Sequence, residues 1–144
     1  MITYSNTNIK GHNGHVITIH EDFKPYLDKM NFIAVDLSIV VWVMSSLRHS
    51  TNVPGAIVTP AKMSNHLVGM ALDINIQRGS VWYNSKGLAS PIGAILDFIL
   101  QCEAIGLRWG GRFSTPDPVH FDLPVNLKDP KKWQEIYEKV QGNI

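Results

Sequence analysis

Apolar and polar residues alternate in segments 71–76 and 119–123, and this alternation predicts two half-buried strands. The apolar positions of the two segments are Leu72, Ile74, Ile76, Val119, Phe121 and Leu123. The opposite face carries Asp73 in the first segment and His120 and Asp122 in the second. Because aspartate is depleted in strands, its presence there needs a reason. If the two strands are neighbours in one sheet, Asp73 and His120 converge on the same side of it.

Short strands are also expected at 15–20, 56–59 and 107–110. Residues 78–89 contain several turn residues and predict an exposed excursion that carries Trp82 and Tyr83. These two aromatic side chains either line a groove or cover the core, and the sequence favours neither interpretation.

Four helices are expected, at 21–30, from about 32 to 47, from 90 to about 106, and at 129–140. In the second of these, apolar residues fall on one stripe at helical spacing, which predicts a buried central helix: Leu37, Val40, Met44 and Leu47. Ser90 is expected to cap the third helix and Asp129 the fourth, because each directly precedes a proline that suits a first helical turn.

These elements predict an α+β domain, in which an antiparallel sheet of about four strands has helices on one face and at the ends. The chain has 144 residues, which is the size of one domain, and neither a repeat nor a linker divides it. We therefore expect residues 1–144 to form a single domain.

Composition excludes several classes of protein. The formal net charge of +1 lacks the basic excess that nucleic-acid-binding proteins usually carry, so we expect no nucleic-acid partner. The single cysteine, Cys102, lies in an apolar run and is expected to be a buried, inert thiol. The most apolar segment, 32–47, is shorter than the roughly 20 residues that cross a bilayer, so we expect no membrane association.

Two motifs place candidate metal ligands at fixed offsets. The motif S-x-H-x-x-G-x-A-x-D runs from Ser64 to Asp73, and the motif D-P-V-H runs from Asp117 to His120. Two imidazoles and one carboxylate, from His66, His120 and Asp73, can hold one divalent metal ion and leave a fourth position open, as in catalytic zinc sites. Asp117 precedes the last ligand by three residues and is a candidate general base.

Together with the segment W-G-G at 109–111, these motifs resemble the zinc D-alanyl-D-alanine carboxypeptidase family, also called VanY-like or M15 peptidases. Relatives in that family include the L-alanyl-D-glutamate endopeptidases of phage endolysins. The resemblance covers roughly Arg48 to Leu123 and implies a hedgehog/DD-peptidase-like α+β fold with one Zn²⁺ per chain. It also implies hydrolysis of a peptidoglycan stem peptide or another D-amino-acid-containing peptide by a metallopeptidase catalytic domain.

The resemblance assigns His66, Asp73 and His120 as the zinc ligands and Asp117 as the catalytic base. Many members have glutamate at the position of Asp117, and the shorter aspartate requires a closer backbone to reach the same water. Many members also have Gly-Tyr-Arg upstream, of which this chain matches only Arg48. Arg48 is expected to bind a substrate carboxylate or to stabilise the oxyanion.

Two other functions stay open at this stage. One is a non-catalytic zinc-containing binding domain of the same fold, and the other is a metal-dependent hydrolase of another substrate, such as a nuclease or a cell-wall amidase. The choice between carboxypeptidase and endopeptidase action is also open. We expect a monomer that is cytoplasmic as synthesised, because residues 1–10 lack the apolar stretch of a secretory signal. Such an enzyme reaches the cell wall after lysis or through a specialised secretion system.

Overall fold

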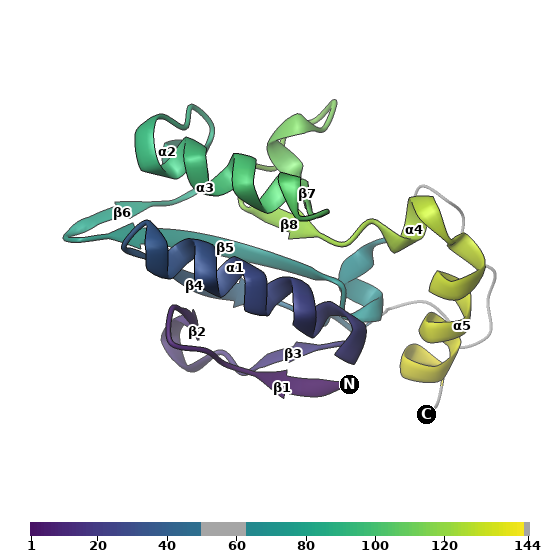
Figure 1. Ribbon diagram of the computed structural model, residues 1–144. Coiled ribbons are helices and arrows are strands. Elements are labelled where there is room, and N and C mark those ends of the chain that lie inside the picture. Colours follow the sequence, from purple (N-terminus) through teal and green to yellow (C-terminus); the bar gives the residue numbers. More distant parts are fainter. Residues whose placement is uncertain (50–62, 143–144) are drawn as a thin grey trace.

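The longest strand, β5 (Ala71–Arg78), lies at the centre of the main sheet in the computed structural model, which describes residues 1–49 and 63–142 (Figure 1). Neighbouring strands follow in the order β2 (Ile9–Gly11), β4 (Ile39–Ser45), β5, β8 (His120–Asp122) and β7 (Arg108–Trp109). A further strand, β6 (Val81–Tyr83), forms a hairpin with β5. The pairing of β2 with β4 is parallel, and the other pairings of this sheet are antiparallel.

The α+β class is confirmed, but the expected antiparallel sheet of about four strands is wrong. The described residues form a mixed sheet of six strands and a separate sheet of two, in which β1 (Ile2–Tyr4) pairs with β3 (Ile17–Ile19). Strands β1, β2 and β6 have three residues each, which is too few for alternation to show in a sequence. The expected strands at 15–20 and 107–110 are present as β3 and β7, whereas 56–59 lies outside the described residues.

The expected helix from about 32 to 47 is also wrong, because the chain changes from helix to strand within it. Helix α1 (Lys24–Asp36) follows a 3-10 turn and has Pro25 in its first turn. It ends before Ser38, whose positive φ of 57° interrupts the helical backbone. The following strand β4 is rich in β-branched residues, which favour strands, and alternate residues along it are fully buried.

Helices α1 and α3 (Gly93–Ala104) cover one face of the sheet (Figure 1). The side chains between them and the sheet include Leu27, Met30, Ile74, Ile76, Phe98 and Phe121, all with no exposed surface. Cys102 lies in the same core, so its expected burial is confirmed, and burial raises the pKa of its thiol far above the usual value. Helix α3 begins later than expected: its N-cap position is Ile92 instead of Ser90, without a side-chain capping hydrogen bond, and Gly93 at its start has a positive φ of 57°.

Helices α4 (Val125–Lys128) and α5 (Pro130–Gln141) lie at one end of the sheet (Figure 1). The expected cap of the last helix is confirmed, because the side chain of Asp129 accepts a hydrogen bond from the backbone N–H of Lys132 at 3.1 Å. The fully buried Trp133 stacks on Tyr137 and donates a hydrogen bond to the carbonyl oxygen of Ser64 at 3.1 Å. Helix α5 therefore braces the loop that carries the S-x-H motif. In the described part of the chain, no helix combines the length and apolarity of a membrane span.

The expected excursion at 78–89 contains β6 and the short helix α2 (Ser85–Leu88). Trp82 is 50% exposed and stacks on Trp42 of β4, with ring centroids 5.8 Å apart. Tyr83 is partly buried and packs against the core. The two aromatic side chains therefore differ, since Trp82 lies on an exposed surface of the sheet and Tyr83 helps to cover the core.

Candidate metal centre

The three predicted ligands lie together at the end of β5 that is next to β8. Nε2 of His66 is 3.3 Å from Oδ1 of Asp73, and Nδ1 of His120 is 3.5 Å from the same oxygen. One ligand atom from each residue can be chosen so that all three atoms lie within 4.8 Å of one another. The structure therefore brings together side chains from the loop before β5, from β5 itself and from β8.

Local backbone structure explains this convergence. Asp73 is directly opposite His120 in the antiparallel pairing of β5 with β8, so the two side chains share a face of the sheet. His66 lies in a 3-10 turn (Asn65–Val68). Ser64 caps this turn, because its side-chain oxygen accepts a hydrogen bond from the backbone N–H of His66. The turn ends at Gly69 with a φ of 70°, where a Cβ would come within 2.6 Å of the backbone nitrogen of His20.

Hydrogen bonds hold each ligand histidine in one orientation. Nδ1 of His66 is 2.8 Å from the carbonyl oxygen of Ser46, which can only accept, so this nitrogen carries the proton and Nε2 is free to bind a metal. Nε2 of His120 is 2.7 Å from Oδ2 of Asp122, which leaves Nδ1 for the metal. Asp122 is therefore a buried partner of the His120 imidazole and not a solvated strand residue.

Asp122 is itself held by groups that the sequence did not reveal as part of the site. It is 1% exposed, and Arg108 donates two hydrogen bonds to its carboxylate, from Nε at 3.0 Å and from Nη2 at 2.7 Å. Asn65 donates a further bond to Oδ2 at 3.1 Å. Arg108 lies directly opposite Asp122 in the pairing of β7 with β8, so the signal is a register that only the sheet defines.

Burial and charge act in opposite directions on the site's ionisable groups. Burial raises the pKa of Asp73, but hydrogen bonds from His120 and His66 and the charge of Arg48 lower it by more, to well below the usual range. The pKa of Asp122 is lowered by its partners in the same way. For His120, burial lowers the pKa, but the bonds to Asp122 and Asp73 raise it to about 9. Both carboxylates are therefore anionic at neutral pH, and Nδ1 of His120 must lose its proton before a metal binds.

Arg48 lies beside the predicted ligands, and its side chain contacts one of them, Asp73. Its Nη2 is 2.5 Å from Oδ2 of Asp73, which is the oxygen that does not face the histidines, and its Nε donates to Oγ of Ser45 at 3.1 Å. The backbone N–H of Arg48 donates to the carbonyl oxygen of His66 at 3.0 Å. Its side chain remains 52% exposed, so part of the guanidinium faces solvent at the site.

Asp117 stands at the start of the tight turn that leads to His120. Its carbonyl oxygen accepts a hydrogen bond from the N–H of His120 at 3.1 Å, and its own N–H donates to the carbonyl oxygen of Gly110 at 2.9 Å. The residue is exposed, so its carboxylate is accessible to solvent. The indole of Trp109 donates to the carbonyl oxygen of Pro118 at 2.7 Å, which ties the W-G-G segment to the same turn.

Gly110 permits this close approach, and its replacement by alanine should disrupt the site. A Cβ at Gly110 would overlap the carbonyl oxygen of Asp117 and come within 2.8 Å of the Cβ of His120. Because backbone must move to relieve the overlap, we expect Gly110→Ala to lower both metal affinity and the free energy of unfolding, the latter by about 1–3 kcal/mol. Metal titration and urea unfolding measure the two effects.

Gly87→Ala is the matched control for that substitution. Its added Cβ would meet only the side chain of Tyr83, at an ordinary contact distance of 3.4 Å. Metal affinity should then stay at the wild-type value. If Gly110→Ala kept wild-type metal affinity and stability, the turn at Asp117 would not depend on its close approach to Gly110.

Residues 58–123 match the M15 family model described as D-alanyl-D-alanine carboxypeptidase. This segment, somewhat less than half of the chain, is similar to the M15 peptidases. The matched segment contains all three ligands and Asp117, whereas Arg48 precedes it. The match supports a peptidase, and the candidate metal centre lies within the matched segment.

Among solved structures, this chain is similar to the L-Ala D-Glu endopeptidase ChiX of Serratia marcescens, at 23% sequence identity. The similarity covers 74% of this chain and 81% of that chain, with a TM-score of 0.44. A comparison with curated proteins gave no match.

Proposed function

We propose that this protein is a zinc-dependent peptidase of the M15 type that hydrolyses peptide bonds in the stem peptides of bacterial peptidoglycan. The observation that carries the proposal is the cluster of His66, Asp73 and His120, in which hydrogen bonds leave one nitrogen of each imidazole directed to a shared point. A carboxylate with two imidazoles suits zinc, and three protein ligands leave a coordination position open for reaction. The family match supports peptide hydrolysis as that reaction.

The donor set fits the metal in charge as well as in geometry. Asp73 supplies one negative charge, and the partners of the two imidazoles are a neutral carbonyl at Ser46 and an anion at Asp122. A bound zinc ion supplies Lewis acidity, which polarises a carbonyl group and lowers the pKa of water. The remaining steps require a base for the attacking water and donors for the substrate, which the protein must provide.

We assign the base to Asp117. Its exposed carboxylate accepts the proton of the attacking water and later passes it to the amine that leaves. An aspartate reaches less far than the glutamate of many family members, so the backbone of this residue must lie closer to the site. The hydrogen bonds of Asp117 to Gly110 and His120 hold its backbone beside a ligand, which supports the assignment.

Arg48 is proposed to bind the substrate and to position a ligand. Its Nη2 holds the outer oxygen of Asp73, which keeps Oδ1 directed to the histidines. A guanidinium has five N–H donors, and among the described residues the Arg48 side chain donates from Nε to Ser45 and from Nη2 to Asp73. The remaining donors can bind a substrate carboxylate or the oxyanion that develops at the cleaved bond.

Metal analysis combined with mass spectrometry of digested peptidoglycan tests this function. We expect one zinc per chain and the release of stem-peptide fragments, loss of release after chelation, and recovery when zinc is restored. The masses of the fragments identify the cleaved bond and thereby distinguish a carboxypeptidase from an endopeptidase. Stoichiometric zinc without cleavage would contradict the proposal and favour a binding domain, and cleavage at an amide between sugar and peptide would favour an amidase.

A further inference from the structure

A cavity of about 470 Å³ has lining residues that are close in sequence to the candidate metal ligands, and they come from β4, β5, the segment before β8, α2 and the N-cap position of α2. The lining residues are Met44, Asn75, Asn84, Ser85, Lys86 and Val119. Asn75 stands two positions after Asp73 on the same face of β5, so its Cα lies roughly 7 Å from the Cα of that ligand. Val119 directly precedes His120. A peptide bound at the metal centre and extended along β5 therefore enters this cavity within about two residues of the cleaved bond.

The side-chain amide of Asn75 has unused hydrogen-bonding capacity in the cavity. Its Oδ1 is buried and has no hydrogen-bond partner among the residues that the structure describes. Buried acceptors in native proteins are satisfied in the large majority of cases, so an unused one at a cavity indicates a ligand group. A carboxamide offers both an acceptor and donors, which complement the N–H and C=O groups of an extended peptide.

The cavity also combines a positive charge with an apolar wall. Lys86 is exposed on α2, and none of the ion pairs formed within 1–49 and 63–142 involves it. Met44 and Val119 provide the apolar contacts. This combination complements a side chain that has an aliphatic stem and a carboxylate at its end.

We infer that this cavity binds a carboxylate-bearing residue of the peptide substrate, one or two positions from the cleaved bond. Asn75 pairs with a peptide group of the substrate, Met44 and Val119 contact the aliphatic stem, and Lys86 pairs with the carboxylate. The inference rests on the proposed peptidase function and names the substrate feature that the site selects. It also predicts that a peptide in which this carboxylate is amidated is a poorer substrate.

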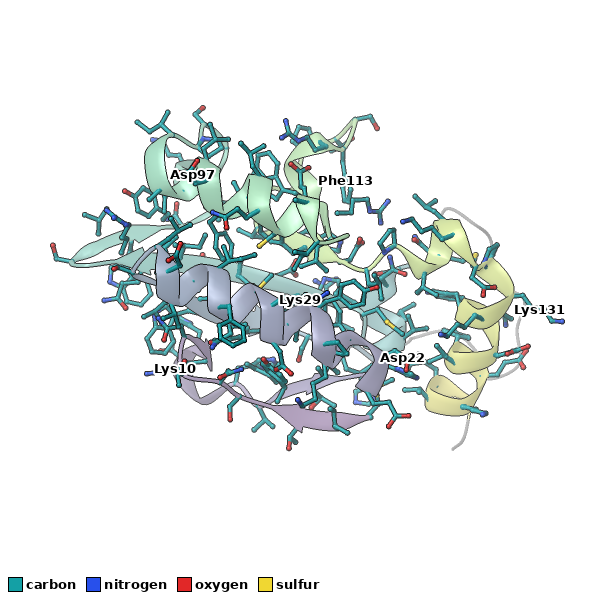
Figure 2. All side chains as sticks on the ribbon, in the orientation of Figure 1. Lys10, Asp22, Lys29, Asp97, Phe113 and Lys131 are labelled. Atoms are coloured by element: carbon teal, nitrogen blue, oxygen red, sulfur yellow. The ribbon has the colours of Figure 1, made fainter. Side chains whose placement is uncertain are left out.

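The test uses pairs of synthetic peptides that contain the bond identified in the peptidoglycan digest. The two peptides of a pair differ only in whether the acidic residue near that bond carries a carboxylate or a carboxamide. Wild type should cleave the carboxylate form with a kcat/KM roughly fivefold higher, as expected for one partly exposed ion pair. Lys86→Gln should lose this preference. Lys131→Gln, the same change on α5 and far from α2 (Figure 2), should keep it.

Asn75→Ala tests the second contact. It should raise KM for both peptides by about tenfold, because one peptide hydrogen bond is lost, and should keep the preference for the carboxylate form. Zinc content and Tm show whether this variant remains folded. If Lys86→Gln kept the preference, or Asn75→Ala kept the wild-type KM, the cavity would not be the subsite, although the peptidase function would stand. If zinc-loaded wild type cleaved neither peptidoglycan nor its peptides, the proposed function itself would fail.

Discussion

Replacing His66 or His120 with alanine should reduce the zinc content from one ion per chain to nearly none and abolish peptide hydrolysis. Each substitution removes one of three ligands, and the remaining two cannot hold the ion against dialysis. Asp73→Ala should have the same effect and also leaves Arg48 without its partner at the site. Elemental analysis after dialysis measures the metal, and fragment release from peptidoglycan measures the activity.

His120→Ala should lower the free energy of unfolding less than is usual for a buried residue. Its partner Asp122 keeps the two hydrogen bonds from Arg108 and the one from Asn65, so no buried charge is left unpaired. Circular dichroism of His120→Ala tests whether the variant is folded. His49→Ala, at an exposed histidine outside the cluster, is the control and should retain full zinc. Stoichiometric zinc in His120→Ala would contradict the ligand assignment.

Replacing Asp117 with alanine should separate metal binding from catalysis. We expect zinc to stay at one per chain, because the side chain of Asp117 is exposed and is not one of the three clustered ligands. The kcat should fall by about 10²–10⁴-fold, the range for removal of a general base, with little change in KM. Steady-state kinetics on the peptide identified in the digest measures both constants.

Two variants sharpen this test. Asp97→Ala removes another exposed carboxylate, from α3, and should leave kcat at the wild-type value (Figure 2). Asp117→Glu restores the base with a longer arm and should recover part of the rate, since the carboxylate is present but displaced by one methylene. A wild-type kcat in Asp117→Ala would show that another group, or the metal alone, activates the water.

The cluster of His66, Asp73 and His120 could be predicted because its geometry is encoded in short stretches of chain. Alternation puts Asp73 and His120 on the polar faces of their strands, and the observed register places them opposite each other. Each motif offers its ligands within ten residues, so local spacing carries most of the information. The sequence argument required the strands that carry Asp73 and His120 to be neighbours, and the pairing of β5 with β8 confirms this.

The groups that orient the ligands could not be predicted. Ser46, Arg108 and Asn65 reach the site through a backbone carbonyl, a strand register and a side-chain amide. None of these contacts has a fixed sequence offset from its ligand. The cavity beside Asn75 could not be predicted either, because it forms between elements that are far apart in the sequence.

The failed prediction of a helix to Leu47 shows where periodicity is ambiguous. Apolar residues in 32–47 are so frequent that a helical stripe and a strand alternation both fit the pattern. The conformation is decided by the turn at Ser38 and by the pairing of β4 with both β2 and β5. Backbone hydrogen bonds to two neighbouring strands stabilise the extended form, and such partners are not visible in a local window.

The sequence by itself determined the α+β class, the three candidate ligands and the candidate base, because these depend on side-chain chemistry and on periodicities within single elements. Only the tertiary structure decided the number of strands, the tautomers of the ligand histidines, the pairing of Arg48 with Asp73, and the cavity that extends the site. These features arise from contacts between segments that are distant in the chain. Such contacts depend on packing and strand register, which a local sequence pattern does not specify.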